Sequence, residues 1–229
     1  MDIFYNEYIY YIMSKISIII QARCGSSRLP NKLFKKICNK TVLEHVVDRL
    51  KRCKLVDDII IATTVEQKDD CIEDFCKENG ILYYRGEENN VLDRYYQTAK
   101  NFNCDNIIRI TSDCPLIDPN IVDDMISKFF KYKLSFYDIE YSNNDIGANG
   151  GFPDGCNPCI FTFYELEVAL HNSTTNYEKE HVTPYLIKKY ENNIKYKLPL
   201  NKSYNNLILK NLHLSLDTYD DYDFISNIF

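Results

Sequence analysis

The sequence predicts an α/β fold, in which helices flank a mostly parallel sheet, because short apolar runs alternate with amphipathic segments. The runs that begin at Ile16 and Ile59 are almost continuously apolar, which is typical of strands buried on both faces of a parallel sheet. The segments between such runs are long enough to form crossover helices. Since these crossovers are almost always right-handed, the order favours a sheet built from βαβ units.

Capping residues mark where the helices of the first half begin and end. Thr41 and Glu44 form a capping box, and Gly80 can end the following helix in a left-handed conformation. Asn90 can cap the next helix, and Asp118 with Pro119 suits the cap and first position of another. We expect helices over residues 42–50, 71–76, 91–102 and 119–129, and strands at 16–21, 59–62, 81–84 and 106–110.

The pattern changes from about residue 136. Residues 136–143 look like a strand, and 144–155 hold four of the seven glycines, which suits a substrate-binding loop better than core. Further elements are a helix at 164–171, helical spacing between 177 and 190, a strand at 212–216 with one apolar face, and a last helix from Thr218 to Phe229.

Length and composition indicate one cytoplasmic domain. The 229 residues suit a main domain over 15–229, with an excursion at about 136–200 and an N-terminal extension at 1–14. A net charge of −6 argues against nucleic acid as a partner. Nine scattered cysteines favour reduced thiols in a cytoplasm. No apolar run is long enough to span a membrane, and residues 1–15 do not resemble a signal peptide.

A small-residue loop with three cations follows the first strand. The loop comprises Arg23, Gly25, Ser26, Ser27, Arg28 and Lys32. Backbone N–H groups of such a loop can point at phosphate oxygens, while the cations neutralise the remaining charge. The alternative is an ordinary turn whose cations are solvated. Because exposed cations contribute little to folding, we expect substitutions here to spare stability.

Two aspartates stand where predicted strands end. Asp113 follows the strand at 106–110, and Asp217 follows the one at 212–216. Because the carboxyl ends of strands in an open parallel sheet converge on the ligand crevice, the two carboxylates can hold Mg²⁺ beside a triphosphate. Taken singly, each is also a common turn former or helix cap.

These motifs resemble a known family. Gln-Ala-Arg-x-Gly-Ser-Ser-Arg-Leu-Pro-x-Lys, which ends at Lys32, is similar to the N-terminal signature of cytidylyltransferases that activate acidic sugars, the CMP-Kdo synthetases and SpsF-like spore-coat proteins. Thr-x-Asp-x-Pro-Leu around Asp113 and Asp-Thr-x-x-Asp from Asp217 resemble the family's two metal-ligand motifs. The likeness runs from about Lys15 to the C-terminus.

The resemblance implies the Rossmann-like fold of the nucleotide-diphospho-sugar transferases and transfer of CMP from CTP, with Mg²⁺, to a Kdo-like or sialic-acid-like sugar for surface polysaccharide. It implies that Ala22 and the loop bind the triphosphate, that Arg23, Lys32, Asp113 and Asp217 act in catalysis, and that the protein forms a homodimer. It places Asp93 and Arg94 near the nucleotide, and Asp154, Gly155, Glu180 and His181 on the acceptor side.

Three residues leave alternatives open. Asp93 also suits the first turn of a helix on electrostatic grounds alone. Arg109, within an apolar strand, is either part of a structural ion pair or a ligand contact. His181 can titrate near neutrality but is as easily packed.

The segment from Cys156 to Cys159 departs from the family pattern, which leaves the acceptor open. We interpret its two cysteines as ordinary thiols that flank a turn, because no partner pair completes a zinc site.

Three other functions are less favoured. A sugar-1-phosphate nucleotidyltransferase would carry a glycine-rich loop that is not matched, and a glycosyltransferase would carry Asp-x-Asp at a strand end. Asp221-Tyr-Asp223 has that spelling but falls within a predicted helix. A non-catalytic nucleotide-binding regulator would not need all three cations and both aspartates.

Overall fold

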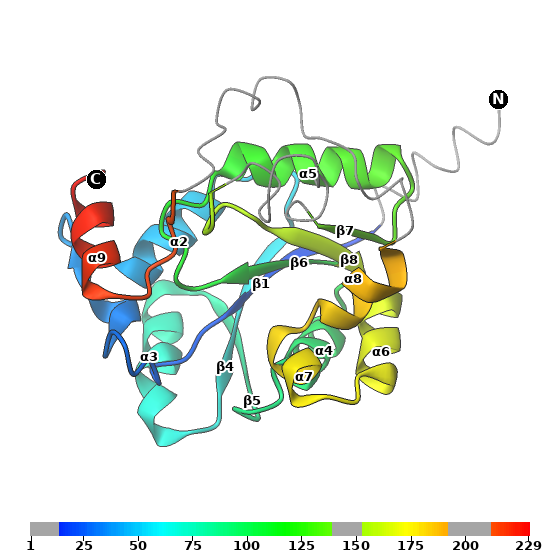
Figure 1. Ribbon diagram of the computed structural model, residues 1–229, viewed down its shortest axis with the longest axis horizontal. Helices are drawn as coiled ribbons and strands as arrows, with labels where there is room; N and C mark the ends of the chain where they lie inside the picture. The colour runs from blue at the N-terminus through cyan, green and yellow to red at the C-terminus, as the bar shows by residue number, and fades with distance from the viewer. Residues whose placement is uncertain (1–13, 139–152, 192–211) are drawn as a thin grey trace.

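One six-stranded sheet organises the part of the chain that the computed structural model describes, residues 14–138, 153–191 and 212–229. Its strand order is β5-β4-β1-β6-β8-β7 (Figure 1). The strands are β1 Ile16–Gln21, β4 Asp58–Thr64, β5 Leu82–Gly86, β6 Asn106–Thr111, β7 Phe136–Asp138 and β8 Cys159–Thr162. Neighbours among β5, β4, β1 and β6 are parallel, whereas β8 is antiparallel to both β6 and β7. The predicted mostly parallel α/β sheet is confirmed.

Helices cover both faces of this sheet. Ile18 and Ile20 of β1 pack in a core with α2, α3 and α5, whereas Ile19 belongs to the opposite core with α4, α6 and α8. Figure 1 shows α5 along the top and α4, α6, α7 and α8 gathered below the other face. The helices are α2 Val42–Leu50, α3 Asp70–Asn79, α4 Val91–Asn101, α5 Pro119–Lys131, α6 Phe163–Asn172, α7 Asn176–His181, α8 Pro184–Tyr190 and α9 Tyr219–Ser226. Two short 3₁₀ turns complete the set, η1 Lys32–Phe34 before β2 (Lys36–Ile37) and η2 Gln67–Asp69 before α3.

The predicted caps form the expected hydrogen bonds. Thr41 and Glu44 make both bonds of their capping box at α2, and Asn90 accepts from the N–H of Asp93 at α4. Asp118 caps α5 with proline at its first position. Gly80 ends α3 with φ 63°, the left-handed conformation that glycine adopts without strain. Local signals therefore set the helix boundaries of the first half.

One prediction for the second half needs correction. Residues 212–216 form no strand: His213 makes one isolated bridge to Asp154, because the backbone N–H groups of Leu214 and Leu216 donate to two different loops, at Asp154 and Asp113. The segment interpreted as a turn flanked by Cys156 and Cys159 leads into β8, which begins at Cys159, and both cysteines are free thiols.

The helical spacing predicted between 177 and 190 is confirmed as two helices, α7 and α8, which are separated at Val182 with φ 69°. The strand expected at 136–143 is observed over 136–138, and the rest lies outside the described residues, as do most of the glycine-rich loop and nearly all of the N-terminal extension.

A short two-stranded hairpin was not anticipated. It pairs β2 Lys36–Ile37 with β3 Lys40–Thr41 and leads directly into α2. Its strands are too short to carry an alternating pattern in the sequence. Positive φ angles at Cys38 and Asn39 form its turn.

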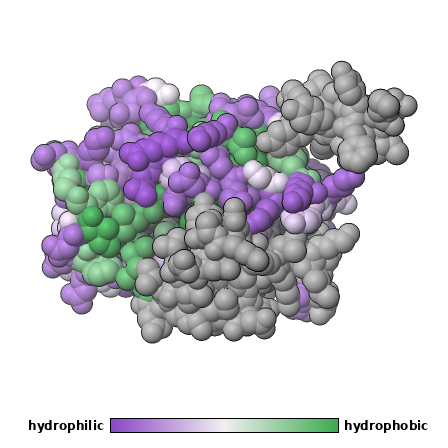
Figure 2. Space-filling model, turned by 90° about the horizontal axis from the view of Figure 1, so that it is seen from above, coloured by the Kyte–Doolittle hydropathy of each residue, from purple (hydrophilic) through white to green (hydrophobic). Residues whose placement is uncertain are grey.

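The outer surface has a hydrophilic area and a hydrophobic area. Figure 2 shows hydrophilic side chains along α5 and a hydrophobic area at the end of the molecule where Figure 1 draws α9. Near that end Phe224, Ile228 and Phe229 keep 45%, 49% and 39% of their surface exposed. Exposed apolar areas of this kind suit contacts with partners, and the homodimer stays a prediction. No helix within the described ranges combines the length and apolar character that a membrane crossing requires.

Candidate active site

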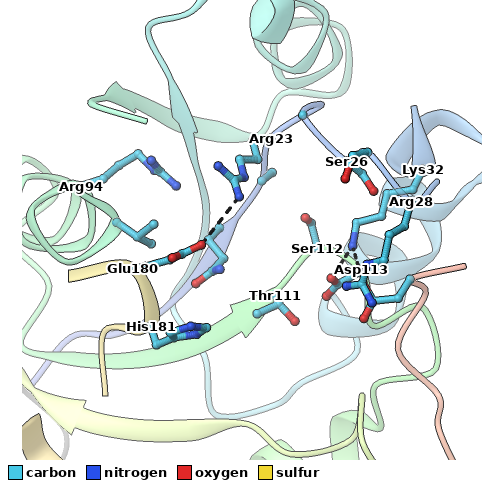
Figure 3. A pocket seen from close by; sticks show the side chains of 16 residues that line it. Arg23, Ser26, Arg28, Lys32, Arg94, Thr111, Ser112, Asp113, Glu180 and His181 are labelled. Carbon is cyan, nitrogen blue, oxygen red and sulfur yellow. Dashed lines mark hydrogen bonds and ion pairs between the residues drawn. The ribbon is translucent and has the colours of Figure 1, made fainter. Parts of the chain in front are cut away.

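A cavity of about 270 Å³ opens where β1 and β6 end, at the carboxyl edge of the parallel strands (Figure 3). Most of the residues predicted for a nucleotide site line it. They are Ala22, Arg23, Gly25, Ser26, Ser27, Arg28, Lys32, Arg94, Asp113 and Asp217, with Glu180 and His181 at the far side. Segments far apart in the sequence therefore meet in one place.

The loop that leaves β1 is held in shape by its own hydrogen bonds. The N–H of Cys24 donates to the buried carboxylate of Asp69 at 2.6 Å. Ser26 accepts from the N–H of Leu29 at 3.2 Å, and Leu29 is fully buried. The loop is thus fixed at its start and at its end, while its small residues face the cavity.

Lys32 lies between the two aspartates, and Figure 3 shows its ammonium group beside Asp113. Its Nζ is 2.6 Å from Asp113 Oδ2 and 3.3 Å from Asp217 Oδ1, and it also donates to the carbonyl of Leu216. Its side chain is only 13% exposed. The expectation that exposed cations make up this loop is therefore wrong for Lys32. The ammonium group of Lys32 contacts the carboxylates of both Asp113 and Asp217. The two carboxylates therefore lie close enough together to bind a second cation jointly.

Proton affinities in this cluster follow from its charges. Burial would raise the pKa of Asp113, but the charge and hydrogen bond of Lys32 outweigh burial and hold that pKa below its ordinary value. Burial would likewise lower the pKa of Lys32, yet Asp113 and then Asp217 raise it. Both side chains are therefore ionised around neutral pH.

The remaining loop cations reach in different directions. Arg28 is 65% exposed and pairs with Asp217 Oδ1 at 3.1 Å. Arg23 lies across the cavity, with its guanidinium nitrogens 3.5 Å from Glu88 and 3.9 Å from Glu180 of α7. These solvent-exposed pairs are weak, so both cations are available to an anionic ligand.

Arg94 adds a buried positive charge at the same end as Arg23 (Figure 3). The side chain is among the most buried, and its Nε has no hydrogen-bond partner among the described residues. Burial, reinforced by the nearby charge of Arg23, lowers the pKa of Arg94. Asp93 is different: it is not among the described residues that line the cavity, and its carboxylate accepts from Gln97 one turn later.

A second cavity of about 280 Å³ adjoins the first, and Thr111 and His181 line both. Asp154 and Gly155 lie in this second cavity. Gly155 has φ 92°, and a Cβ there would come within 2.6 Å of the Leu214 carbonyl carbon. Only glycine fits this approach of the two segments. His181 stacks at a tilt on Tyr177, with ring centroids 4.5 Å apart.

Arg109 also lines the second cavity. It stands in register with Cys159 of β8, which in turn pairs with Asp138 of β7, so the three side chains share one face of the sheet. Its side chain is partly exposed, and Nε has no hydrogen-bond partner in the described part of the chain. Both alternatives left open by the sequence, a structural ion pair and a ligand contact, are compatible with this geometry, because Arg109 lines the cavity and the charge of Asp138 is nearby.

Sequence reasoning did not identify His213 and Ser215, which hold Asp154. His213 Nδ1 lies 2.9 Å from Asp154 Oδ2, and the Ser215 hydroxyl donates to the same oxygen at 3.0 Å. A pattern in the sequence could have identified them. His213 and Ser215 alternate with leucines in the segment interpreted as a strand, so both would lie on its polar face. Their role depends on Asp154, about sixty residues away, and was therefore not visible locally.

Comparisons with known proteins agree with the cavity's composition. A family model described as cytidylyltransferase matches residues 17–225. The spore coat polysaccharide biosynthesis protein SpsF of Bacillus subtilis is 27% identical over 221 residues, which cover 95% of this chain and 87% of SpsF.

Two solved structures are similar. A cytidylyltransferase from Leptospira borgpetersenii is 33% identical, with a TM-score of 0.81 over 94% of this chain and 88% of that one. A CMP:2-keto-3-deoxy-manno-octonic acid synthetase complexed with CTP has a TM-score of 0.63 at 15% identity, over 94% and 98% of the two chains. The second likeness shows the fold alone.

Proposed function

The chain belongs to the cytidylyltransferase family, and on this premise we propose that it transfers CMP from CTP to an acidic sugar and releases pyrophosphate. The first cavity is the proposed seat of CTP. The observation that carries this assignment is the set of cations that converge there from two segments, Arg23 and Lys32 from the loop and Arg94 from α4. A triphosphate is the ligand that such a set of charges and backbone N–H groups fits.

Mg²⁺ is the proposed metal, held by Asp113 and Asp217. Carboxylate oxygens are its preferred ligands, and magnesium is commonly bound by one or two carboxylates plus substrate phosphates. The cation of Lys32 between both carboxylates supports a shared site. In the described residues no group of three or more His, Cys, Asp or Glu side chains is arranged to hold a metal, so the remaining ligands would come from phosphate and water.

The proposed reaction divides the work among the side chains of the cavity. A hydroxyl of the acceptor attacks the α-phosphorus of CTP, and the bond from that phosphorus to the bridging oxygen of the pyrophosphate breaks. Arg23, Arg28 and Lys32 stabilise the charge of the departing pyrophosphate, because they are already in place when it develops. Bound Mg²⁺ would polarise the α-phosphate and favour ionisation of the attacking hydroxyl.

The second cavity is the proposed acceptor site. Its boundary with the first, at Thr111 and His181, suits an acceptor that reaches the α-phosphate of CTP. Arg109 supports an acidic acceptor, because it lines this cavity and a guanidinium there can pair with a carboxylate. We further propose that the product serves the synthesis of surface polysaccharide and that the enzyme acts in the cytoplasm.

The structure argues against the alternative of a glycosyltransferase. The Asp221-x-Asp223 pair of a glycosyltransferase would need a free carboxylate at Asp221. That carboxylate is used in the capping box of α9, where it accepts from Thr218 Oγ1 at 2.8 Å and from the Thr218 N–H at 2.7 Å.

CTP should raise the melting temperature more than ATP, GTP or UTP do, because a ligand that binds only the folded state stabilises it by mass action. At a concentration one hundred times its dissociation constant, the gain is about 2.7 kcal/mol. Thermal unfolding with each nucleotide, with and without Mg²⁺, measures it. An equal shift with all four would leave a triphosphate site and remove the cytidylyltransferase assignment.

Arg109→Gln should raise the KM for the acidic acceptor by roughly 10- to 100-fold, since a hydrogen bond to a charged group contributes about 1.5 to 3 kcal/mol. The CTP-induced shift in melting temperature should stay unchanged. Pyrophosphate release with sugar acids and their neutral analogues measures the effect, with the exposed Arg52→Gln as control. A variant that still preferred the acid as strongly as wild type would remove Arg109 from acceptor recognition.

A further inference from the structure

Two thiols meet at the start of the nucleotide loop. Cys24 follows β1, and Cys71 lies in the first turn of α3, and their Sγ atoms are 3.3 Å apart. All nine cysteines lie within the described residues, and all are free thiols. Cys71 is exposed and Cys24 is half-buried, so the pair is open to solvent from one side. Neither thiol has a role in the proposed reaction.

The backbone, not only the side chains, holds this pair together. The N–H of Cys24 donates to Asp69 Oδ1 at 2.6 Å, and Asp69 stands two residues before Cys71. The other oxygen of Asp69 accepts from the hydroxyl of Thr64 at the end of β4, and both of these residues are fully buried. A buried carboxylate thus ties the loop to the start of α3, which keeps the two sulfurs close.

We propose that Cys24 and Cys71 are a modification site, at which a small disulfide such as glutathione disulfide converts the two thiols into a reversible disulfide bond. Cys71, the exposed thiol, attacks one sulfur of the oxidant and releases one glutathione thiol, leaving a mixed disulfide. Cys24 then attacks the Cys71 sulfur and releases the second glutathione thiol. Each departing thiolate takes up the proton that the attacking thiol gives up, and the oxidant gains the two electrons that the cysteines lose.

Burial, and after it the contact with Cys71, raises the pKa of the Cys24 thiol. Cys24 is therefore a slow nucleophile toward a reagent in solution. It is nevertheless positioned to attack a mixed disulfide on Cys71, because that reaction is intramolecular and the sulfurs are already in contact. With this order of steps, the disulfide between Cys24 and Cys71 forms in preference to a lasting mixed disulfide with glutathione.

Closing the bond should weaken nucleotide binding. A disulfide requires the sulfurs to approach from 3.3 Å to about 2.0 Å, and we infer that the loop takes up part of this movement relative to α3. Cys24 stands between Arg23 and Gly25, which line the cavity proposed for the triphosphate. A displacement of about 1 Å can cost about 100-fold in a positioned site. This consequence rests on the proposed function, whereas formation of the bond does not.

Peptide mass spectrometry after incubation with glutathione disulfide tests the bond directly. Trypsin releases residues 24–28 and 69–77 as separate peptides, and oxidised protein should yield them joined, with fragmentation assigning the link to Cys71 and not to Cys76. The joined peptide should vanish in Cys71→Ser and after dithiothreitol, and persist in Cys38→Ser, a control at another exposed cysteine. Absence of the joined peptide in wild type, or its persistence in Cys71→Ser, would overturn the site.

The effect on binding is measured by the CTP-induced shift in melting temperature. Oxidised wild type should need at least tenfold more CTP for the same shift, dithiothreitol should restore the response, and Cys71→Ser should be insensitive to the oxidant. By reciprocity, CTP should lower the fraction of joined peptide at equilibrium with a fixed ratio of glutathione to glutathione disulfide. A joined peptide with an unchanged CTP response would overturn the effect on binding. If no nucleotide shifts the melting temperature of reduced wild type, the proposed function fails, and the joined peptide still decides the disulfide site.

Discussion

Lys32→Met should lower the free energy of unfolding by about 1 to 3 kcal/mol and reduce kcat/KM for CTP by roughly 100- to 1,000-fold. Stability falls because two carboxylates then face each other without the cation that separates them. The loss is smaller than for a fully buried pair, since Asp113 and Asp217 keep 22% and 26% of their side chains exposed. Activity falls because the charge that meets the departing pyrophosphate is gone.

The stability difference should depend on pH in a defined direction. The pKa of Asp113 is lowered in the folded protein, so its contribution is present above the unfolded value, about 3.9, and is lost as pH falls through the lowered folded value. The pKa of Lys32 is raised, so its contribution is present below about 10.4 and is lost as pH rises through the folded value. The advantage of wild type is therefore largest between about pH 5 and 10.

Urea unfolding in metal-free buffer across this pH range measures the difference, and Lys36→Ala, which removes an exposed cation from β2 four residues later, is the control. Adding Asp113→Asn to Lys32→Met should recover part of the lost stability, because the surplus negative charge is removed, but none of the activity. A Lys32→Met protein as stable as wild type at pH 7 would contradict the bridging role of this lysine.

The part of the fold that the sequence predicts correctly is the part set by local interactions. Each cap in the first half acts within four residues of its helix, and the buried parallel strands are apolar on both faces, so neither signal depends on distant contacts. Strand β8 has no such signal. It is placed by pairing with β6 and β7 on either side, and its first residue belongs to a Cys-x-x-Cys spelling that suggests a turn.

The candidate site shows the same division. The loop, Asp113 and Asp217 can be found from residue types and strand ends, but the position of Lys32 between the aspartates cannot. Its contacts to them join segments 81 and 185 residues apart in the sequence. The segment at 212–216 was misinterpreted for this reason: alternation of leucines predicts a strand, whereas its hydrogen bonds go to two loops. Its function is to bring Asp217 to Lys32 and His213 to Asp154.

The two aspartates should act as one unit. Asp113→Asn and Asp217→Asn each keep the shape of the side chain and remove its charge, and each should leave the fold intact while reducing turnover by roughly 100- to 1,000-fold. The double variant should be scarcely worse than either single one, because groups that serve one function lose activity non-additively. The backbone bond from the Leu216 N–H to the Asp113 carbonyl is unaffected by these substitutions, so the two segments stay joined.

Pyrophosphate release against Mg²⁺ concentration, and the Mg²⁺ dependence of the CTP-induced shift in melting temperature, separate this model from a structural role. If Asp113 only formed a turn and Asp217 only supported the cap of α9, each change would cost about 1 kcal/mol of stability and leave turnover near normal. Asp221→Ala is the matched control, because Asp221 does serve the cap of α9 and should lose stability while keeping its Mg²⁺ dependence. Because Asp217 stands four residues before Asp221, both substitutions disturb the same segment. Only the shared cation site predicts that Asp217→Asn and Asp221→Ala respond differently to Mg²⁺. An active Asp217→Asn enzyme with wild-type Mg²⁺ dependence would refute the shared site.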